Sequence, residues 1–118
     1  MWEVEYTNEF EDWWETLSEM EQKRVAFSVN LLEEFGPLLK YPHSTSVVQS
    51  KHSSMRELRS QCEGRPLRTF YIFDPHRVAI LLIGGDKTGN DRFYDEMVPK
   101  ADRIYDEYLK EIMEGNDD

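Results

Sequence analysis

The sequence lacks the features of a disulfide-stabilised, membrane-spanning or exported protein. It has one cysteine, Cys62, so no disulfide can form within the chain. Its longest apolar run, Val78 to Ile83, is far shorter than the ~20 residues that a membrane span needs. The N-terminus is acidic where a signal peptide would be basic and then apolar. We therefore expect a cytoplasmic protein with no membrane segment.

The composition predicts a single globular domain over residues 1–118. Of the 118 residues, 39% are hydrophobic, and the aromatic residues are three Trp, six Tyr and six Phe. This content is enough for one sizeable core and argues against disorder. We expect only residues 113–118 to form a frayed tail.

Basic residues are scarce, and most of them lie in one stretch. The chain has 14 Lys and Arg against 24 Asp and Glu, a net charge of -10. Residues 51–92 hold eight basic and five acidic residues, whereas the rest of the chain holds six basic and 19 acidic residues. Phosphate binding depends on Lys and Arg, and a local positive surface attracts anions at short range even on an acidic protein. This stretch is therefore the predicted anion-binding region.

The N-terminal residues predict a strand and then a short helix. Trp2, Val4 and Tyr6 alternate with glutamates, a pattern typical of a strand with one buried face. Asn8 is the predicted N-cap of a helix over about residues 9–17.

A second helix begins at Ser18, which forms a capping box with Glu21, and ends at Gly36. Its apolar residues recur at helical spacing, and we expect all of them to face the core. They are Val25, Phe27, Val29, Leu31, Leu32 and Phe35.

Residues 37–54 show no hydrophobic period and are predicted to form a loop. His43 and His52 lie nine residues apart, and no cysteine or carboxylate pair completes a metal-binding set. We therefore expect neither a metal ion nor another cofactor.

Residues 55–94 predict three strands and a glycine-rich loop. On the second strand, Arg68 and Phe70 share one face. Asp74 starts a turn into Val78–Ile83, which is apolar on both faces and is expected in the middle of a covered sheet.

The loop Gly84–Gly89 does not match a phosphate-binding Walker loop, because Asp86 precedes Lys87 where that motif requires glycine. Asn90 is the predicted cap of a C-terminal helix. The apolar stripe of that helix continues across Pro99, which predicts a kink or a fresh first turn there.

The stretch MRELR, GRPLRTFYIF and RVAILLIGGDKTGNDRFY resembles the HigB-like branch of the RelE/ParE toxin superfamily, particularly its phage-derived members. The resemblance covers almost the whole chain. It implies an α+β, RelE-like fold in which two N-terminal helices pack on a central antiparallel sheet, followed by a C-terminal helix.

The resemblance also implies a function. RelE-like and HigB-like proteins are toxins of toxin-antitoxin pairs and cleave mRNA in the ribosomal A site. We therefore expect a metal-independent endoribonuclease, an mRNA interferase whose partners are mRNA, the ribosome and a cognate helix-turn-helix antitoxin.

The family's site residues map onto the basic stretch. The implied catalytic residues are Arg68, Arg56, Tyr94 and Lys87. Arginines would stabilise the phosphoryl oxygens, and Tyr94 would stack on a base or transfer a proton. The implied RNA-binding residues are Arg59, Arg65, Arg92, His52 and Lys51, with His52 also a candidate for proton transfer. The sequence departs from the RelE pattern at Glu57, where a catalytic lysine would stand.

Other roles stay open for several of these residues. Arg59 is equally suited to pair with Glu57 or Glu63, and Arg92 with Glu96, while Tyr94 is equally suited to the core. The alternative function is a non-enzymatic interaction module, either a ParE-like gyrase inhibitor or a degenerate toxin that only binds an antitoxin.

Overall fold

The computed structural model describes residues 1–115 as an α+β domain, which confirms the predicted fold class. In chain order the elements are β1 (Val4–Tyr6), α1 (Asn8–Glu15), α2 (Glu19–Phe35), the short 3-10 helix η1 (Gly36–Leu38), β2 (Ser44–Ser46), β3 (Arg56–Cys62), β4 (Arg65–Phe73), β5 (Ala79–Asp86) and α3 (Phe93–Gly115). No helix within this range is both long and apolar enough to cross a membrane.

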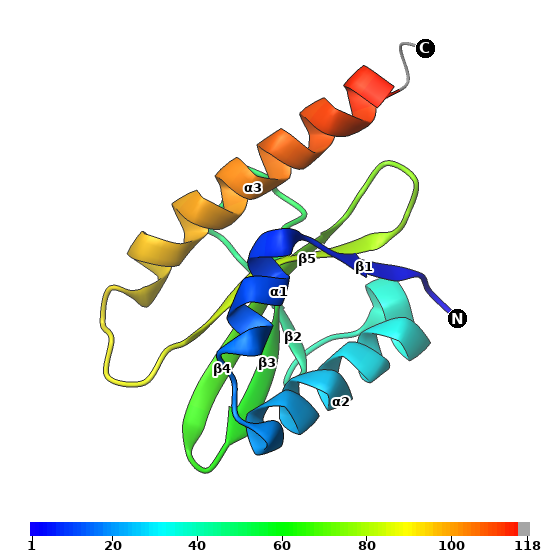
Figure 1. Ribbon diagram of the computed structural model, residues 1–118. Coiled ribbons are helices and arrows are strands. Elements are labelled where there is room, and N and C mark those ends of the chain that lie inside the picture. The colour runs from blue at the N-terminus through cyan, green and yellow to red at the C-terminus, as the bar shows by residue number, and fades with distance from the viewer. Residues whose placement is uncertain (116–118) are drawn as a thin grey trace.

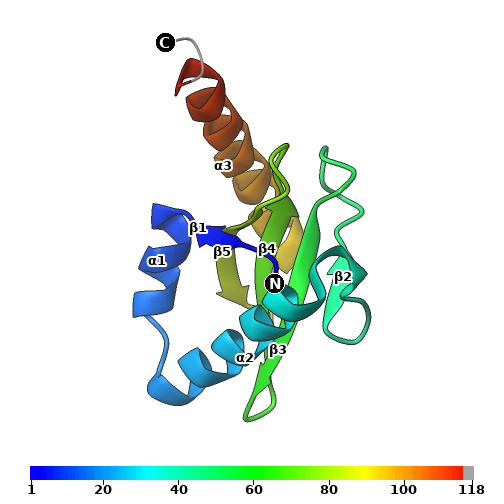
Figure 2. The ribbon, with the colours of Figure 1, turned by 90° about the vertical axis from the view of Figure 1, so that its right-hand side faces the viewer.

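The strands form one sheet in the order β1-β5-β4-β3-β2, which can be followed from edge to edge in Figure 2. Strands β2 to β5 are antiparallel neighbours, which confirms the prediction for the three expected strands β3, β4 and β5. β1 is the exception, because it pairs in parallel with β5 at the sheet edge. Two helices separate β1 from the other strands, so no hairpin dictates its direction. The sheet is therefore mixed, and β4 occupies its centre instead of the doubly apolar β5.

Helices cover both faces of the sheet. α1 and α2 lie in front of the strands in Figure 1 and bury Phe10, Val25 and Leu32 against one face. α3 covers the opposite face, where Phe93, Val98, Ala101, Ile104 and Tyr105 pack on Phe70, Ile72, Ile80 and Leu82. Ile80 and Leu82 are almost completely buried, which confirms that β5 is covered.

The predicted helix boundaries are right for α2 and shifted for α1. Ser18 and Glu21 form the expected capping box, and Gly36 ends α2 with a positive φ of 54°. Thr7, not Asn8, caps α1, because its side-chain oxygen accepts a hydrogen bond from the backbone N–H of Phe10. α1 ends at Glu15, two residues before the predicted end.

The apolar stripe of α2 is wider than the face that the helix buries. Val25 and Leu32 are fully buried against the sheet, whereas Phe27 is 60% and Phe35 44% exposed. The prediction that all six apolar residues face the core is therefore wrong for these two. Helical spacing identifies a side of the helix, but the width of the contact depends on how the helix lies on the sheet.

The predicted loop over residues 37–54 contains η1 and the short strand β2. Ser44 of β2 lies opposite Leu58 of β3. The strand is three residues of Ser and Thr, so it carries no hydrophobic alternation for sequence reasoning to detect.

The glycine pair lies inside β5 and not in the loop that follows it. A Cβ on Gly84 would lie 2.2 Å from the ring of Trp13, and a Cβ on Gly85 would lie 2.9 Å from the ring of Phe93. The missing side chains let α1 and α3 approach the same end of β5 from opposite faces. The loop itself therefore begins only at Lys87.

α3 continues through Pro99 as a single helix, so the proline does not begin a second helix. It continues to Gly115, so residues 113–115, predicted as part of a frayed tail, are helical. The remaining tail residues, 116–118, lie outside the described range.

We expect Gly84→Ala to lower the free energy of unfolding by about 1–3 kcal/mol, because the new methyl group overpacks the contact with Trp13. Urea denaturation followed by circular dichroism measures this change. Gly115→Ala is the control, since a Cβ there meets nothing within 4 Å. Equal denaturation midpoints for the two variants would contradict this account of the packing.

Candidate active site

A buried ion pair lies on the sheet face that α3 covers. Arg68 of β4 and Glu57 of β3 are 5% and 4% exposed, and Nε of Arg68 lies 3.3 Å from Oε1 of Glu57. The strand register pairs Glu57 with Phe70, whose ring contacts Phe93 at the start of α3. Alternation along both strands therefore brings the two charges to the same face.

Arg68 has one hydrogen-bond donor that finds no partner within the described range. Its Nη1 donates to the backbone oxygen of Leu67 at 3.2 Å, but its buried Nε makes no hydrogen bond of good geometry with any residue of the described range. A buried donor without a partner is rare in native proteins and calls for an explanation such as a ligand or a catalytic role.

Tyr94 contacts the ion pair, and Lys87 lies over the Tyr94 ring. The Tyr94 hydroxyl donates a 2.8 Å hydrogen bond to Oε1 of Glu57, and Nζ of Lys87 lies 5.0 Å from the centre of the Tyr94 ring. Burial raises the pKa of the Tyr94 phenol, and the hydrogen bond to Glu57 raises it further. Tyr94 therefore stays protonated at neutral pH and is available as a proton donor.

Two further cations are candidates for binding an anion. Arg59 lies opposite Arg68 in the register, and its guanidinium lies 5.5 Å from the ring centre of Tyr41. Arg92 is exposed at the start of α3, where Glu96 accepts a hydrogen bond from Asn90 instead. The sequence left open whether Arg59 pairs with Glu57 or Glu63 and whether Arg92 pairs with Glu96. Within residues 1–115 none of these ion pairs forms, so both arginines are available to bind an anion.

The structure places Arg56 on the opposite face of the sheet from Arg68, so the expectation that these two arginines stabilise the same phosphate is wrong. Arg56 pairs in register with Tyr71, in the core under α1 and α2. Its guanidinium donates to the hydroxyls of Ser44 and Ser46 at 2.9 and 3.0 Å. Arg56 directly precedes Glu57, and a single step along a strand reverses the face.

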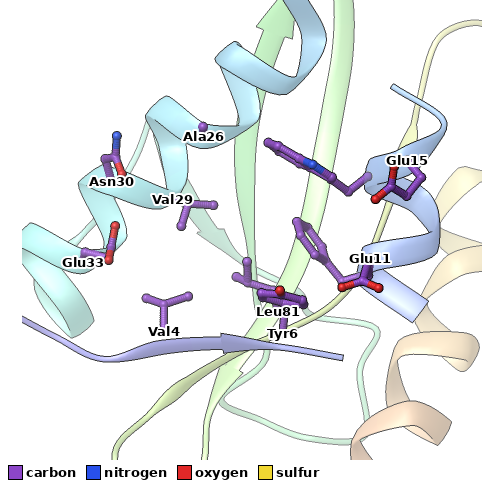
Figure 3. Close-up of a pocket in the computed structure, with 11 residues that line it drawn as sticks. Val4, Tyr6, Glu11, Glu15, Ala26, Val29, Asn30, Glu33 and Leu81 are labelled. Atoms are coloured by element: carbon purple, nitrogen blue, oxygen red, sulfur yellow. The ribbon is translucent and has the colours of Figure 1, made fainter. Parts of the chain in front are cut away.

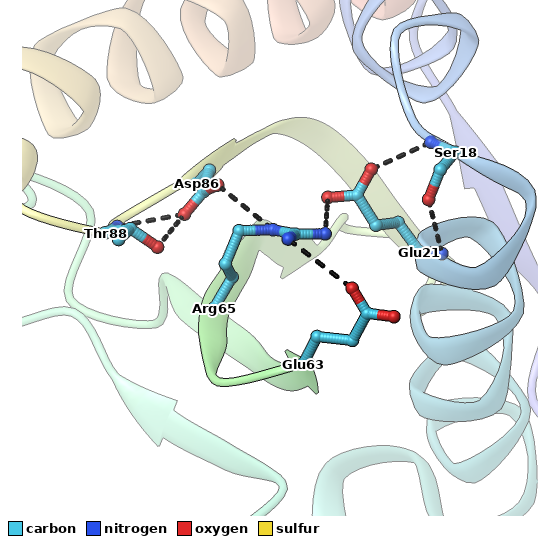
Figure 4. A network of polar contacts seen from close by, with 6 residues as sticks. All are labelled: Ser18, Glu21, Glu63, Arg65, Asp86 and Thr88. Carbon is cyan, nitrogen blue, oxygen red and sulfur yellow. Dashed lines mark hydrogen bonds and ion pairs between the residues drawn. The ribbon is translucent and has the colours of Figure 1, made fainter.

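Arg65 also stands apart from the cluster. It bonds Glu21 at 2.9 Å and lies 3.8 Å from both Glu63 and Asp86, the network drawn in Figure 4. The backbone N–H of Ser18 and the guanidinium together lower the pKa of Glu21. Three carboxylates thus hold Arg65 where it joins the β3–β4 turn to α2 and to the end of β5.

Lys51 and His52 are bound to the middle of α3. Lys51 pairs with Asp106, and Nε2 of His52 lies 2.8 Å from the same carboxylate. The backbone N–H of Lys51 also bonds Asp102, eight residues beyond Tyr94 and so about 12 Å farther along the helix. The structure therefore does not bring these two residues to the Glu57–Arg68 pair.

Glu57 is the site residue that sequence reasoning missed. By sequence it is a departure from the family's lysine and a candidate partner of Arg59, yet it contacts both Arg68 and Tyr94. The available signal was alternation, because Glu57 shares a strand face with Met55, and Arg68 shares one with Phe70, on two strands that form a hairpin.

Comparisons with known proteins agree with this fold. The family model described as phage-derived protein Gp49-like matches residues 12–106. The chain is 40% identical over 100 residues to "Putative toxin HigB3" of Mycobacterium tuberculosis, covering 84% of this chain and 86% of that protein. It is 37% identical over 102 residues to "Putative toxin HigB2" of the same organism, but it spans only 51% of that longer protein.

Solved structures of RelE-type proteins share the fold at low sequence identity. The archaeal RelE-RelB complex from Pyrococcus horikoshii OT3 matches with a TM-score of 0.55 and 12% identity, over 75% of this chain and 97% of that one. A free-state mutant of E. coli RelE matches with a TM-score of 0.52 and 10% identity, over 94% of this chain and 97% of that one. The chain has the fold of the RelE structures, and since the family model and HigB3 both match most of its length, it belongs to the phage-derived Gp49-like family of HigB-like proteins.

Proposed function

We propose that the protein is the toxin of a toxin-antitoxin pair and cleaves mRNA on the ribosome without a metal ion. The observation that carries this proposal is the unused Nε donor of Arg68, buried beside a carboxylate and a protonated tyrosine. A cation, a proton acceptor and a proton donor are the groups that RNA cleavage without a metal requires.

In the proposed reaction, Glu57 accepts the proton of the RNA 2′-hydroxyl. The 2′-oxygen then bonds to the adjacent phosphorus while the bond from phosphorus to the 5′-oxygen breaks, leaving a cyclic phosphate. Arg68 stabilises the charge on the phosphoryl oxygens through its planar, always protonated guanidinium. Tyr94 donates a proton to the departing 5′-oxygen.

This arrangement requires Tyr94 to move when RNA binds. The Tyr94 hydroxyl is hydrogen-bonded to Oε1 of Glu57, and both Arg68 and Glu57 are almost fully buried beneath Tyr94. The more accessible cations Lys87, Arg59 and Arg92 would bind the RNA backbone first and bring the scissile phosphate to the opened pair.

The partner we propose is a small helix-turn-helix antitoxin. Two of the solved structures with this fold are complexes of RelE with RelB. Co-expression with the neighbouring gene, followed by size-exclusion chromatography, should give one shared peak, and two separate peaks would contradict the pairing.

A specific observation also favours the second function, an interaction module without enzymatic activity. The Glu57–Arg68 pair is closed, with each residue only 4–5% exposed, as in a structural ion pair. If the cluster is structural, the protein will bind its antitoxin or another target without cleaving RNA.

Replacing both members of the pair separates catalysis from stability. Arg68→Ala alone leaves the Glu57 carboxylate buried without a counter-charge, which should cost about 3–5 kcal/mol. We expect the double variant Glu57→Gln, Arg68→Gln to fold with a denaturation midpoint above that of Arg68→Ala, yet to cleave mRNA about 10²–10³-fold more slowly than wild type.

Cleavage is measured by mapping mRNA ends on translating ribosomes, and folding by urea denaturation. Arg56→Gln is the matched control, since it removes an arginine from the other face and should retain cleavage. A folded double variant that is as toxic and as active as wild type would refute the assignment and favour the interaction module.

The surrounding cations should govern the salt dependence of RNA binding. We expect Lys87→Ala with Arg92→Ala to reduce the slope of log affinity against log salt by about 1.4, or about 0.7 for each lost phosphate contact on a single strand. Fluorescence anisotropy with a 2′-O-methylated RNA measures binding without cleavage. Lys51→Ala is the control, because Lys51 pairs with Asp106, and an equal effect there would contradict the placement of the RNA path.

A further inference from the structure

An apolar groove opens between α1 and α2, on the sheet face opposite the Glu57–Arg68 pair. It has a volume of about 390 Å³. Figure 3 shows Val4 and Leu81 on its floor, with Ala26 and Val29 on the wall that α2 forms. The wall from α1 includes Trp14, which is only half-buried. The groove is large enough to take several apolar side chains.

The rim of the groove is acidic. Glu11 and Glu15 of α1 lie along one side, and Glu33 of α2 lies on the other, as Figure 3 shows. Among residues 1–115, none of these three carboxylates takes part in an ion pair. Three unpaired negative charges therefore surround an apolar floor, and the rim repels nucleic acid while it attracts Lys and Arg.

The length of the groove fits two turns of a helix. Its α2 wall extends from Ala26 to Glu33, which is about 10 Å along the helix axis. A helix that binds in a groove uses apolar anchors at positions i, i+3 or i+4, and i+7, and these span the same distance.

We propose that this groove anchors the antitoxin through an amphipathic helix, whose apolar ridge enters between α1 and α2 and whose flanking Lys and Arg face Glu11, Glu15 and Glu33. Naming the antitoxin as the partner rests on the proposed function. The groove faces away from Arg68, so this anchor leaves the candidate active site uncovered. Binding of the antitoxin and access of RNA to the toxin are then separate events on opposite faces.

Two variants test the groove with the full chain and the protein encoded by the neighbouring gene. Ala26→Trp fills the groove and should weaken binding by about 30-fold or more, as at other central interface positions. The triple variant Glu11→Lys, Glu15→Lys, Glu33→Lys should associate with the partner more slowly. We expect salt to weaken the affinity of the wild type but not that of this variant. Calorimetry and stopped-flow kinetics measure these effects.

The control is a second triple variant with the same change of charge. Asp12→Lys, Glu34→Lys and Glu114→Lys alter exposed acids that do not line the groove, and this variant should bind like wild type. If both groove variants bind as tightly as wild type, the groove proposal is overturned while the toxin function stands.

A synthetic peptide keeps the test independent of the antitoxin. A helical peptide with leucines at positions 1, 5 and 8 flanked by lysines should bind saturably and shift the fluorescence emission of Trp14. The Ala26→Trp and Trp14→Phe variants should not show this shift. The same peptide flanked by glutamates should not bind. If the lysine peptide fails to bind, the groove proposal is overturned, whereas failure of the neighbouring protein alone counts against the proposed partner.

Discussion

The structure depends on one constraint, which is that the central strands are covered by helices on both faces. α1 and α2 bury one face, and α3 buries the other. Successive residues of a strand point to opposite faces, so every residue of β3 and β4 is assigned to one helical layer or the other. The positions of Arg68, Glu57 and Arg56 all follow from this assignment.

The same constraint separates two groups of residues within the basic stretch. Arg68, with Lys87 nearby, lies on the α3 face beside Glu57 and Tyr94. Arg56 and Arg65 make hydrogen bonds that hold β2 and the β3–β4 turn in place. A count of charges along the chain does not distinguish these residues, although only the first group contains a buried hydrogen-bond donor without a partner in the described range, the Nε of Arg68.

The two faces also differ in the partners that they can accept. Lys87 and Arg59 lie near the Glu57–Arg68 pair, whereas carboxylates that form no ion pair within residues 1–115 border the groove between α1 and α2. In our two proposals, nucleic acid and a basic helix therefore bind to opposite sides of one small domain. The net charge of -10 describes neither face.

The sequence by itself determined the α+β class, the three central strands, the capping box at Ser18 and the burial of Ile80 and Leu82, because local spacing and capping chemistry express these features directly. Only the tertiary structure decided the parallel pairing of β1, the serine strand β2 and the position of Arg56 away from Arg68. Those features depend on register between segments distant in the chain, where one residue of shift reverses the face of a side chain.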